Sequence, residues 1–314
     1  MHECKHLSIS SVALGAWLLA SPVSANVPVS TGWRKEAVRI AEHPSEVIVR
    51  RDAHGRLCAP VFINGAGPFD FIVDTGANGS AAAPAVVERL GLSQPGEVLL
   101  RGVTGSEKAR AVLVESLSVG DLSASDATLP ILSEALDGAD GFLGTGSFFD
   151  KRVLFDLRRN VIAISDSASQ APIAVDADAI PIDLSHARLV VVDAFVNGKP
   201  VTAIIDTGAG GTIGNRALLD LIRDPQRGSR ADRIVGATPQ TYSGDTCALP
   251  PLKLGPLWFA GARVSIADVS LFEHFDLGRR PALLIGMDML GGLDSLIVDY
   301  GARTLRLRAR SSLN

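Results

Sequence analysis

Short apolar runs that end in Gly, Asp or Pro recur along the chain, and two of them carry the same ending. Residues 71–73 and 203–205 each lead directly into Asp-Thr-Gly-Ala, at positions 74–77 and 206–209. Such a run predicts a buried strand, and the glycine behind it predicts a sharp turn. Because a buried carboxylate is costly unless it is paired or used, we expect the two carboxylates to meet.

The pattern around the two phrases also repeats. Each is preceded by an apolar strand and an Asn-Gly pair, which is a strong hairpin-turn signal. The matched segments are 60–63, Asn64-Gly65 and 69–74 in the first half, and 191–196, Asn197-Gly198 and 201–206 in the second. Further matches pair Gly102 with Gly236, 117–120 with 252–255, 141–144 with 283–286, and 154–156 with 297–299. The slowly growing offset between the halves, from 132 to 143 residues, indicates a duplicated domain.

A short helix is predicted after each phrase. In the first half Pro84 suits the first turn and Gly91 ends the helix, while in the second Asn215 can cap a helix over 216–222. The remaining short strands indicate a mostly β protein with two similar lobes and a cleft between them. The expected divisions are a lead-in segment 26–45, an N-terminal lobe 46–164 that begins with a strand at 46–51, a linker 165–179 and a C-terminal lobe 180–314.

Composition and the N-terminus narrow the setting. The chain has 314 residues, is 46% hydrophobic and 20% charged, and has a net charge of −4, which is typical of a globular protein and gives no reason to expect nucleic acid as a partner. Residues 1–25 resemble a secretory signal peptide, with Lys5, an apolar stretch and the small residues 23–25 before Asn26. We therefore expect export, to the periplasm or outside the cell, and no membrane span in the mature chain.

The two phrases, in their matched surroundings, resemble the active-site loops of aspartic proteases, most of all the retropepsin-like branch found in bacteria. That family builds one site from two lobes, each giving one Asp-Thr/Ser-Gly. The resemblance implies a single-chain, two-lobed enzyme with a catalytic pair, Asp74 and Asp206. It also implies supporting roles for the remainder of both loops, which are Thr75, Gly76, Ala77, Thr207, Gly208 and Ala209.

Paired carboxylates suit peptide hydrolysis. Two like charges in one site resist double ionisation, so the pair holds one proton, and one partner activates water while the other polarises the carbonyl; aspartic proteases are the standard example of such a pair. No metal or cofactor is required. Because Ala77 and Ala209 offer no hydroxyl to the carboxylates, we expect an activity optimum at roughly pH 4–6.

The resemblance also implies hairpin flaps about 30 residues after each aspartate, and the sequence leaves open which one covers the substrate. The candidates are Gly102, Val103, Thr104 and Gly105 in the first half and Gly236, Ala237 and Thr238 in the second. A disulfide between Cys58 and Cys247 is left open, as is a pro-segment role for 26–45.

Two functions from different classes remain. The first is an aspartic endopeptidase that acts on polypeptides as a monomer, because both half-sites lie in one chain. The alternative is a non-catalytic binding or scaffold protein that kept the fold. Both Asp-Thr-Gly copies are complete, which favours the enzyme.

Overall fold

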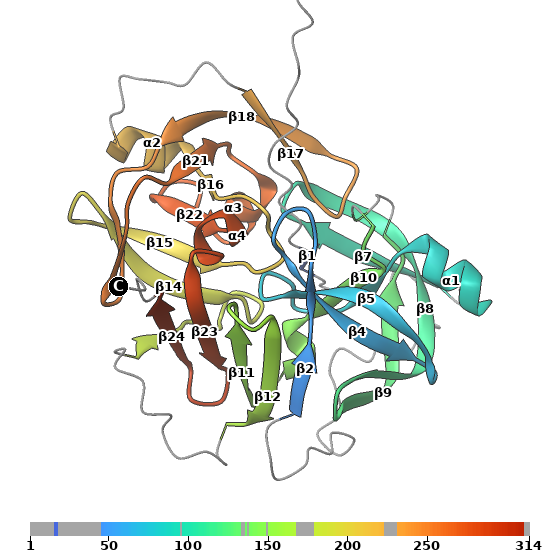
Figure 1. Ribbon diagram of the computed structural model, residues 1–314. Helices are drawn as coiled ribbons and strands as arrows, with labels where there is room; N and C mark the ends of the chain where they lie inside the picture. Colours follow the sequence, from blue (N-terminus) through green and yellow to red (C-terminus); the bar gives the residue numbers. More distant parts are fainter. Residues whose placement is uncertain are drawn as a thin grey trace, which may run out of the picture.

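A computed structural model describes residues 16–17, 45–94, 96–132, 136, 138–148, 150–167, 179–222 and 231–310. In these residues the chain forms three sheets, one in each lobe and one that joins the lobes. Figure 1 shows the first lobe in blue to green and the second in yellow to red. The predicted mostly β fold of two similar lobes is confirmed.

The first lobe is built on the hairpin that carries the first Asp-Thr-Gly-Ala. Strands β4 and β5 pair antiparallel, and β10 runs parallel to β5 on its other side. The elements of this lobe are β3 (Arg50–Arg51), β4 (Leu57–Ile63), β5 (Ala66–Asp74), β6 (Ala81–Ala82), α1 (Pro84–Leu90), β7 (Gly96–Gly102), β8 (Gly105–Val119), β9 (Leu122–Pro130), β10 (Gly141–Gly144) and the 3₁₀ helix η2 (Thr145–Phe148).

The second lobe repeats this plan. Strands β14 and β15 form the matching hairpin, and β22 runs parallel to β15. The elements are β14 (Val190–Val196), β15 (Lys199–Ile205), β16 (Ile213–Gly214), α2 (Arg216–Ile222), β17 (Ala231–Val235), β18 (Thr241–Ala248), β19 (Leu252–Leu254), β20 (Leu257–Phe259), β21 (Arg263–Ile266), α3 (Ser270–His274), β22 (Ala282–Ile285) and α4 (Met287–Leu290).

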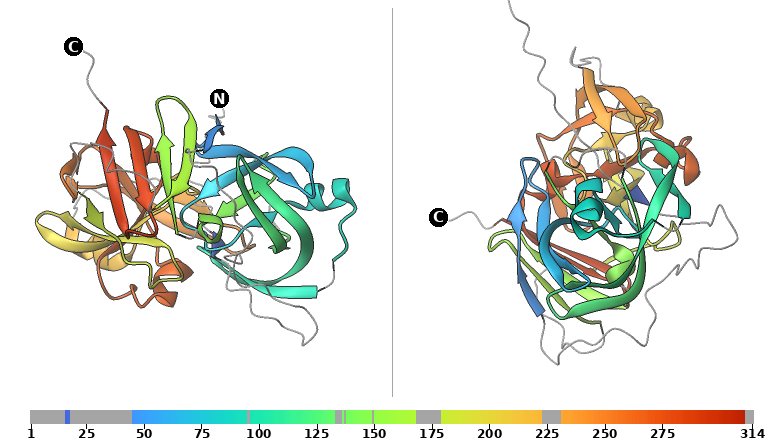
Figure 2. Two further views of the ribbon diagram at one scale, coloured as in Figure 1. Left: turned by 90° about the horizontal axis from the view of Figure 1, so that it is seen from below. Right: turned by 90° about the vertical axis from the view of Figure 1, so that its right-hand side faces the viewer.

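A third sheet joins the lobes, and the repeat pattern alone did not predict it. Its strand order is β13 (Ile180–Pro181), β24 (Thr304–Ala309), β23 (Leu293–Asp299), β11 (Lys151–Asp156), β12 (Val161–Asp166) and β2 (Ser45–Ile48). The repeated segments 154–156 and 297–299 lie on β11 and β23, which pair antiparallel at its centre. Figure 2 shows these green and red hairpins side by side between the lobes.

The local signals in the sequence correspond to the observed turns and caps. Asn64 and Gly65 have φ of 51° and 76°, and Asn197 and Gly198 have 51° and 71°, so both hairpins turn through left-handed residues. Helix α1 ends at Gly91, with φ of 60°. Asn215 caps α2, because its Oδ1 accepts the Leu218 N–H at 2.9 Å.

The lobes differ where proline interrupts a strand. Strand β8 runs unbroken from Gly105 to Val119, whereas the matching stretch of the second lobe is divided into β18 and β19. Pro250 and Pro251 lie between these two strands and have no N–H to donate to a ladder.

Several sequence expectations fall at the edges of the described residues. The proposed signal peptide and lead-in segment lie outside them, except that Ala16–Trp17 form β1 against β7 and Ser45 opens β2. Most of the expected linker also lies outside them, and β12 continues to Asp166.

Cys58 and Cys247 are both buried thiols that no disulfide joins. Within the described residues, no helix has the length and apolar character to cross a membrane.

Candidate active site

The two Asp-Thr-Gly-Ala loops lie at matching strand ends. Asp74 ends β5 and Asp206 follows β15. The parallel neighbours β10 and β22 end beside them, and the helical turns that follow, η2 and α4, hold each loop through backbone bonds. Thr145 and Met287 donate their N–H groups to the carbonyls of Ala77 and Ala209, at 2.7 and 2.8 Å. The apolar-apolar-Gly segments of the repeat therefore support the loops.

The loops meet face to face between the lobes. A Cβ placed on Gly76 would lie 2.3 Å from the carboxyl carbon of Asp206, and one on Gly208 would lie 2.2 Å from that of Asp74. Any side chain at either glycine would displace the opposite carboxylate. The glycines are therefore required for this close approach, in addition to the turn that the sequence predicted.

The two threonines lock the loops together symmetrically. The Thr75 hydroxyl donates to the Ile205 carbonyl at 2.7 Å and accepts the Thr207 N–H at 3.0 Å. The Thr207 hydroxyl donates to the Val73 carbonyl at 2.7 Å and accepts the Thr75 N–H at 3.1 Å. Each buried hydroxyl thus satisfies two backbone groups of the facing lobe, which fixes the register of the carboxylates.

The carboxylates themselves are fully buried but differently bonded. Asp74 Oδ1 accepts one backbone N–H, from Gly76 at 2.7 Å. Asp206 Oδ1 accepts two, from Gly208 at 2.8 Å and Ala209 at 3.0 Å. The Oδ2 atom of each aspartate is buried and accepts no hydrogen bond from the rest of the described residues, so the two carboxyls can share a proton with each other.

Burial sets the protonation state of the pair. Loss of hydration raises the pKa of Asp74 well above its usual range, and the nearby Asp206 charge adds to this rise. Burial also raises the pKa of Asp206, to about 6, while the bond from Asp74 and the two backbone donors hold it down. The second backbone donor at Asp206 favours ionisation of Asp206 over that of Asp74.

The two candidate hairpin turns also meet. The Thr104 and Thr238 hydroxyls lie 3.0 Å apart, and both threonines are buried. The apolar neighbours are exchanged between the lobes: Val103 packs in a cluster of second-lobe residues, and Ala237 packs in a cluster of first-lobe residues. The structure thus brings the two hairpin turns together as a symmetric pair.

Comparison with known families agrees with this geometry. The family model described as aspartyl protease matches residues 59–146 and 192–289, which contain the two Asp-Thr-Gly-Ala loops and their supporting strands. The chain belongs to the aspartyl protease family. A comparison with curated proteins found no match.

Two charged or polar groups of this aspartyl protease chain were missed from the sequence. Arg56 is fully buried and its charge acts on both aspartates. The buried hydroxyl of Tyr300 has no hydrogen-bond partner among the described residues. Burial raises the pKa of Tyr300, and the charge of the nearby Asp74 carboxylate raises it further. The repeat could have indicated Arg56, because His54 and Arg56 recur as His186 and Arg188 at the same 132-residue offset as the aspartates. Tyr300 has Leu157 at its matched position and carried no signal.

Proposed function

We propose that this chain is an aspartic endopeptidase in which Asp74 and Asp206 form the catalytic pair. The observation that carries the proposal is the buried contact of the two loops, which leaves one oxygen of each carboxylate without a donor from the surrounding protein. A fold that buries two adjacent carboxylates spends stability on them, and such arrangements are typical of active sites.

In the proposed reaction the pair begins with one proton, on Asp74. Ionised Asp206 takes a proton from water as that water attacks the peptide carbonyl, while the Asp74 proton polarises the carbonyl oxygen. The proton on Asp206 then passes to the departing nitrogen as the C–N bond breaks, and Asp74 recovers its proton from a hydroxyl of the collapsing intermediate, so the pair again holds one proton. Thr75, Gly76, Ala77, Thr207, Gly208 and Ala209 act as loop support, because they hold the carboxylates in register.

The hairpin turns supply access in this proposal. With Thr104 and Thr238 in contact and both aspartates buried, a polypeptide can enter only if the turns separate. We therefore assign 102–105 and 236–238 as two flaps that open together. We also propose that the protein is a monomer and that it is exported from the cytoplasm, with residues 1–25 removed. The lobe and linker divisions expected from the repeat are part of the same proposal.

The alternative is a scaffold that binds extended peptides without cutting them. A direct test is to incubate the chain from Asn26 onward with reduced, unfolded protein between pH 3 and 8, with and without pepstatin, and to identify products by mass spectrometry. Internal cleavage that pepstatin blocks supports the protease. Peptide binding without cleavage at any pH, in folded protein, supports the scaffold.

A further inference from the structure

Arg56 is a fully buried arginine that the proposed reaction does not use. It follows a tight turn that begins at Asp52. One oxygen of the Asp52 carboxylate accepts the backbone N–H groups of His54 and Arg56, each at 2.9 Å. The other oxygen accepts Nε of Arg56. The turn and the ion pair therefore fix the guanidinium in one place.

The positive charge of Arg56 is only partly neutralised. Its Nη2 donates to the Leu136 carbonyl at 3.4 Å, and its Nη1 is buried without a partner. Asp52 shares its charge with two backbone donors in addition to Arg56. Because an incompletely paired buried cation is costly, its position needs a reason beyond packing.

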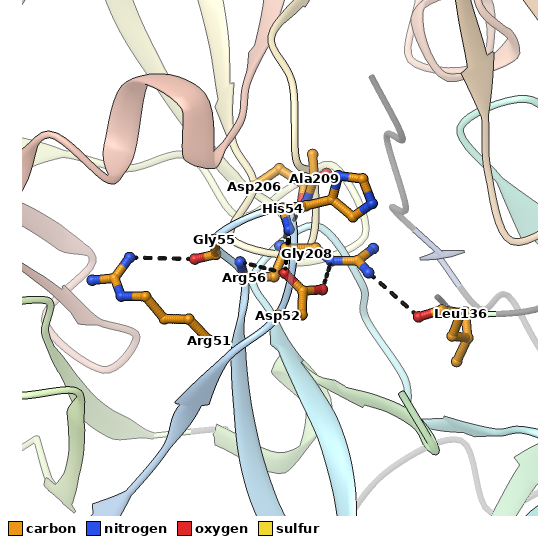
Figure 3. Close-up of polar contacts among 9 residues, drawn as sticks. All are labelled: Arg51, Asp52, His54, Gly55, Arg56, Leu136, Asp206, Gly208 and Ala209. Carbon is orange, nitrogen blue, oxygen red and sulfur yellow. Dashed lines mark hydrogen bonds and ion pairs between the residues drawn. The ribbon is translucent and has the colours of Figure 1, made fainter. Parts of the chain in front are cut away.

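The neighbouring loop offers that reason. Figure 3 shows Arg56 beside Asp206, Gly208 and Ala209 of the second lobe. The charge of Arg56 acts on Asp74 and on Asp206, and in both cases it lowers the carboxyl pKa against the effect of burial. An arginine of the first lobe thus reaches the carboxylate of the second.

The other charged groups around Arg56 do not replace this effect. His54 and Asp52 belong to the same turn. Arg51 donates to the carbonyls of Gly55 and Leu157, and Arg50 pairs with Asp70. Tyr300, which follows β23 of the inter-lobe sheet, is buried, and burial and the charge of Asp74 raise its pKa, so it stays neutral at these pH values.

At the matched turn of the second lobe, the structure describes no buried cation. Arg188 occupies the matched position, but it is exposed, and Leu184 stands where the first lobe has Asp52. The carboxylate of this turn, Asp183, is exposed, accepts the N–H and hydroxyl of Ser185 and pairs with His186. Of the two matched turns, the first therefore supplies the buried charge.

We propose that Arg56 is a positioning residue of the pair, held by Asp52 so that its charge keeps one carboxylate ionised in a site buried from bulk solvent. This inference rests on the proposed function, because only a singly ionised pair needs such support. Without the cation, burial would leave both carboxyls protonated over a wider acidic range, and no base would be available to the attacking water.

The test is a titration of the pair in Arg56→Gln, Arg56→Lys and Arg188→Gln. Carboxyl ¹³C signals of the pair are identified by their loss in Asp74→Asn and Asp206→Asn. We expect Arg56→Gln to move the first ionisation upward by roughly one pH unit, Arg56→Lys to restore part of it, and Arg188→Gln to leave it unchanged. The acid limb of kcat/KM with a peptide substrate should move by the same amount.

Asp52→Asn provides a second, opposite test. It keeps the oxygen that accepts the two backbone N–H groups but removes the counter-charge of Arg56, so the first ionisation should move downward. This variant also decides the matter if Arg56→Gln does not fold. The proposal would be overturned if the titration were unchanged in both variants, or if Arg188→Gln shifted it equally. It would also be overturned if activity fell at every pH while the titration did not move. If the titration moves as expected but the protein cleaves no peptide, the role of Arg56 is supported and the proposed function is wrong.

Discussion

The two Asp-Thr-Gly-Ala loops have almost the same backbone arrangement, but their carboxylates lie in different surroundings. The threonine bonds match within 0.1 Å between the lobes, from 2.7 Å for the two carbonyl contacts to 3.0 and 3.1 Å for the two N–H contacts. The carboxylates differ, because Asp206 accepts two backbone donors and Asp74 accepts one. A symmetric frame therefore holds an asymmetric pair.

This difference teaches how a duplicated site can divide its roles. The position of the carboxylates comes from features that both copies share, namely the threonines, the glycines and the parallel strands β10 and β22. Burial, which both copies share, raises the pKa of both carboxyls, and the difference between them comes from features of one copy, such as the second backbone donor at Asp206. The substitutions below test the shared and the unshared features separately.

The largest effect is expected from replacing either aspartate. Asp74→Asn and Asp206→Asn keep the size of the side chain but remove the acid or the base, so each should reduce kcat by at least roughly a thousandfold. The double variant should be no worse than either single one, because the pair acts as a unit. Circular dichroism verifies folding, and Asp193→Asn, an exposed carboxylate, is the control. Substantial cleavage by either single variant would place the chemistry elsewhere.

Replacing Thr75 or Thr207, which bond the two loops to each other, should reduce stability equally in both lobes. Thr75→Val and Thr207→Val each leave a buried N–H and a buried carbonyl unpaired, so each should lower the free energy of unfolding by about 2–4 kcal/mol. The double variant should lose less than the sum, because each hydroxyl serves the other loop. Urea denaturation measures this, with the strand threonine Thr202→Val as control. A large difference between the two single variants would contradict the symmetric frame.

The shared features are also those that could be read from the sequence. Asp-Thr-Gly-Ala and the Asn-Gly turns are local signals that duplication gave twice, and the cap at Asn215 is a local signal of the second copy alone. The third sheet was missed because pairing of β11 with β23 joins residues far apart in the chain. The packing of Val103 and Ala237 into opposite lobes was missed for the same reason. The anchoring of Arg56 depends on Asp52, which the second copy lacks, so the repeat could indicate the arginine but not its burial.

A third effect concerns stability against pH. The pKa of Asp206 is raised in the folded state to about 6 from an ordinary value of 3.8, and that of Asp74 is raised further. The folded state therefore holds more protons than the unfolded state above pH 4, and stability falls as pH rises through 6. Asp206→Asn removes this loss, so at pH 8 it should be more stable than the unaltered protein by roughly 1–3 kcal/mol.

That gain should vanish at low pH. Below about pH 3 both states are protonated at this position, so Asp206→Asn and the unaltered protein should melt at similar temperatures. Scanning calorimetry at about pH 3 and about pH 8 measures the two differences, with Asp193→Asn as the exposed control. A variant that is equally stabilised at both pH values would show that the gain comes from packing and not from the raised pKa.

The smallest effect distinguishes a localised proton from a shared one. Serine at position 77 or 209 would add a hydroxyl donor to the neighbouring carboxylate and stabilise its ionised form, which lowers its pKa by roughly half a unit. If Asp206 ionises first, Ala209→Ser should lower the acid limb of the kcat/KM profile, which we place near pH 6 from the pKa of Asp206. Ala77→Ser should instead lower the alkaline limb, because it acts on Asp74. Stopped assays across pH 3–9 with one peptide measure both limbs. If both single variants moved the same limb by the same amount, the proton would belong equally to the two carboxyls, and the different surroundings of Asp74 and Asp206 would have no consequence for the chemistry.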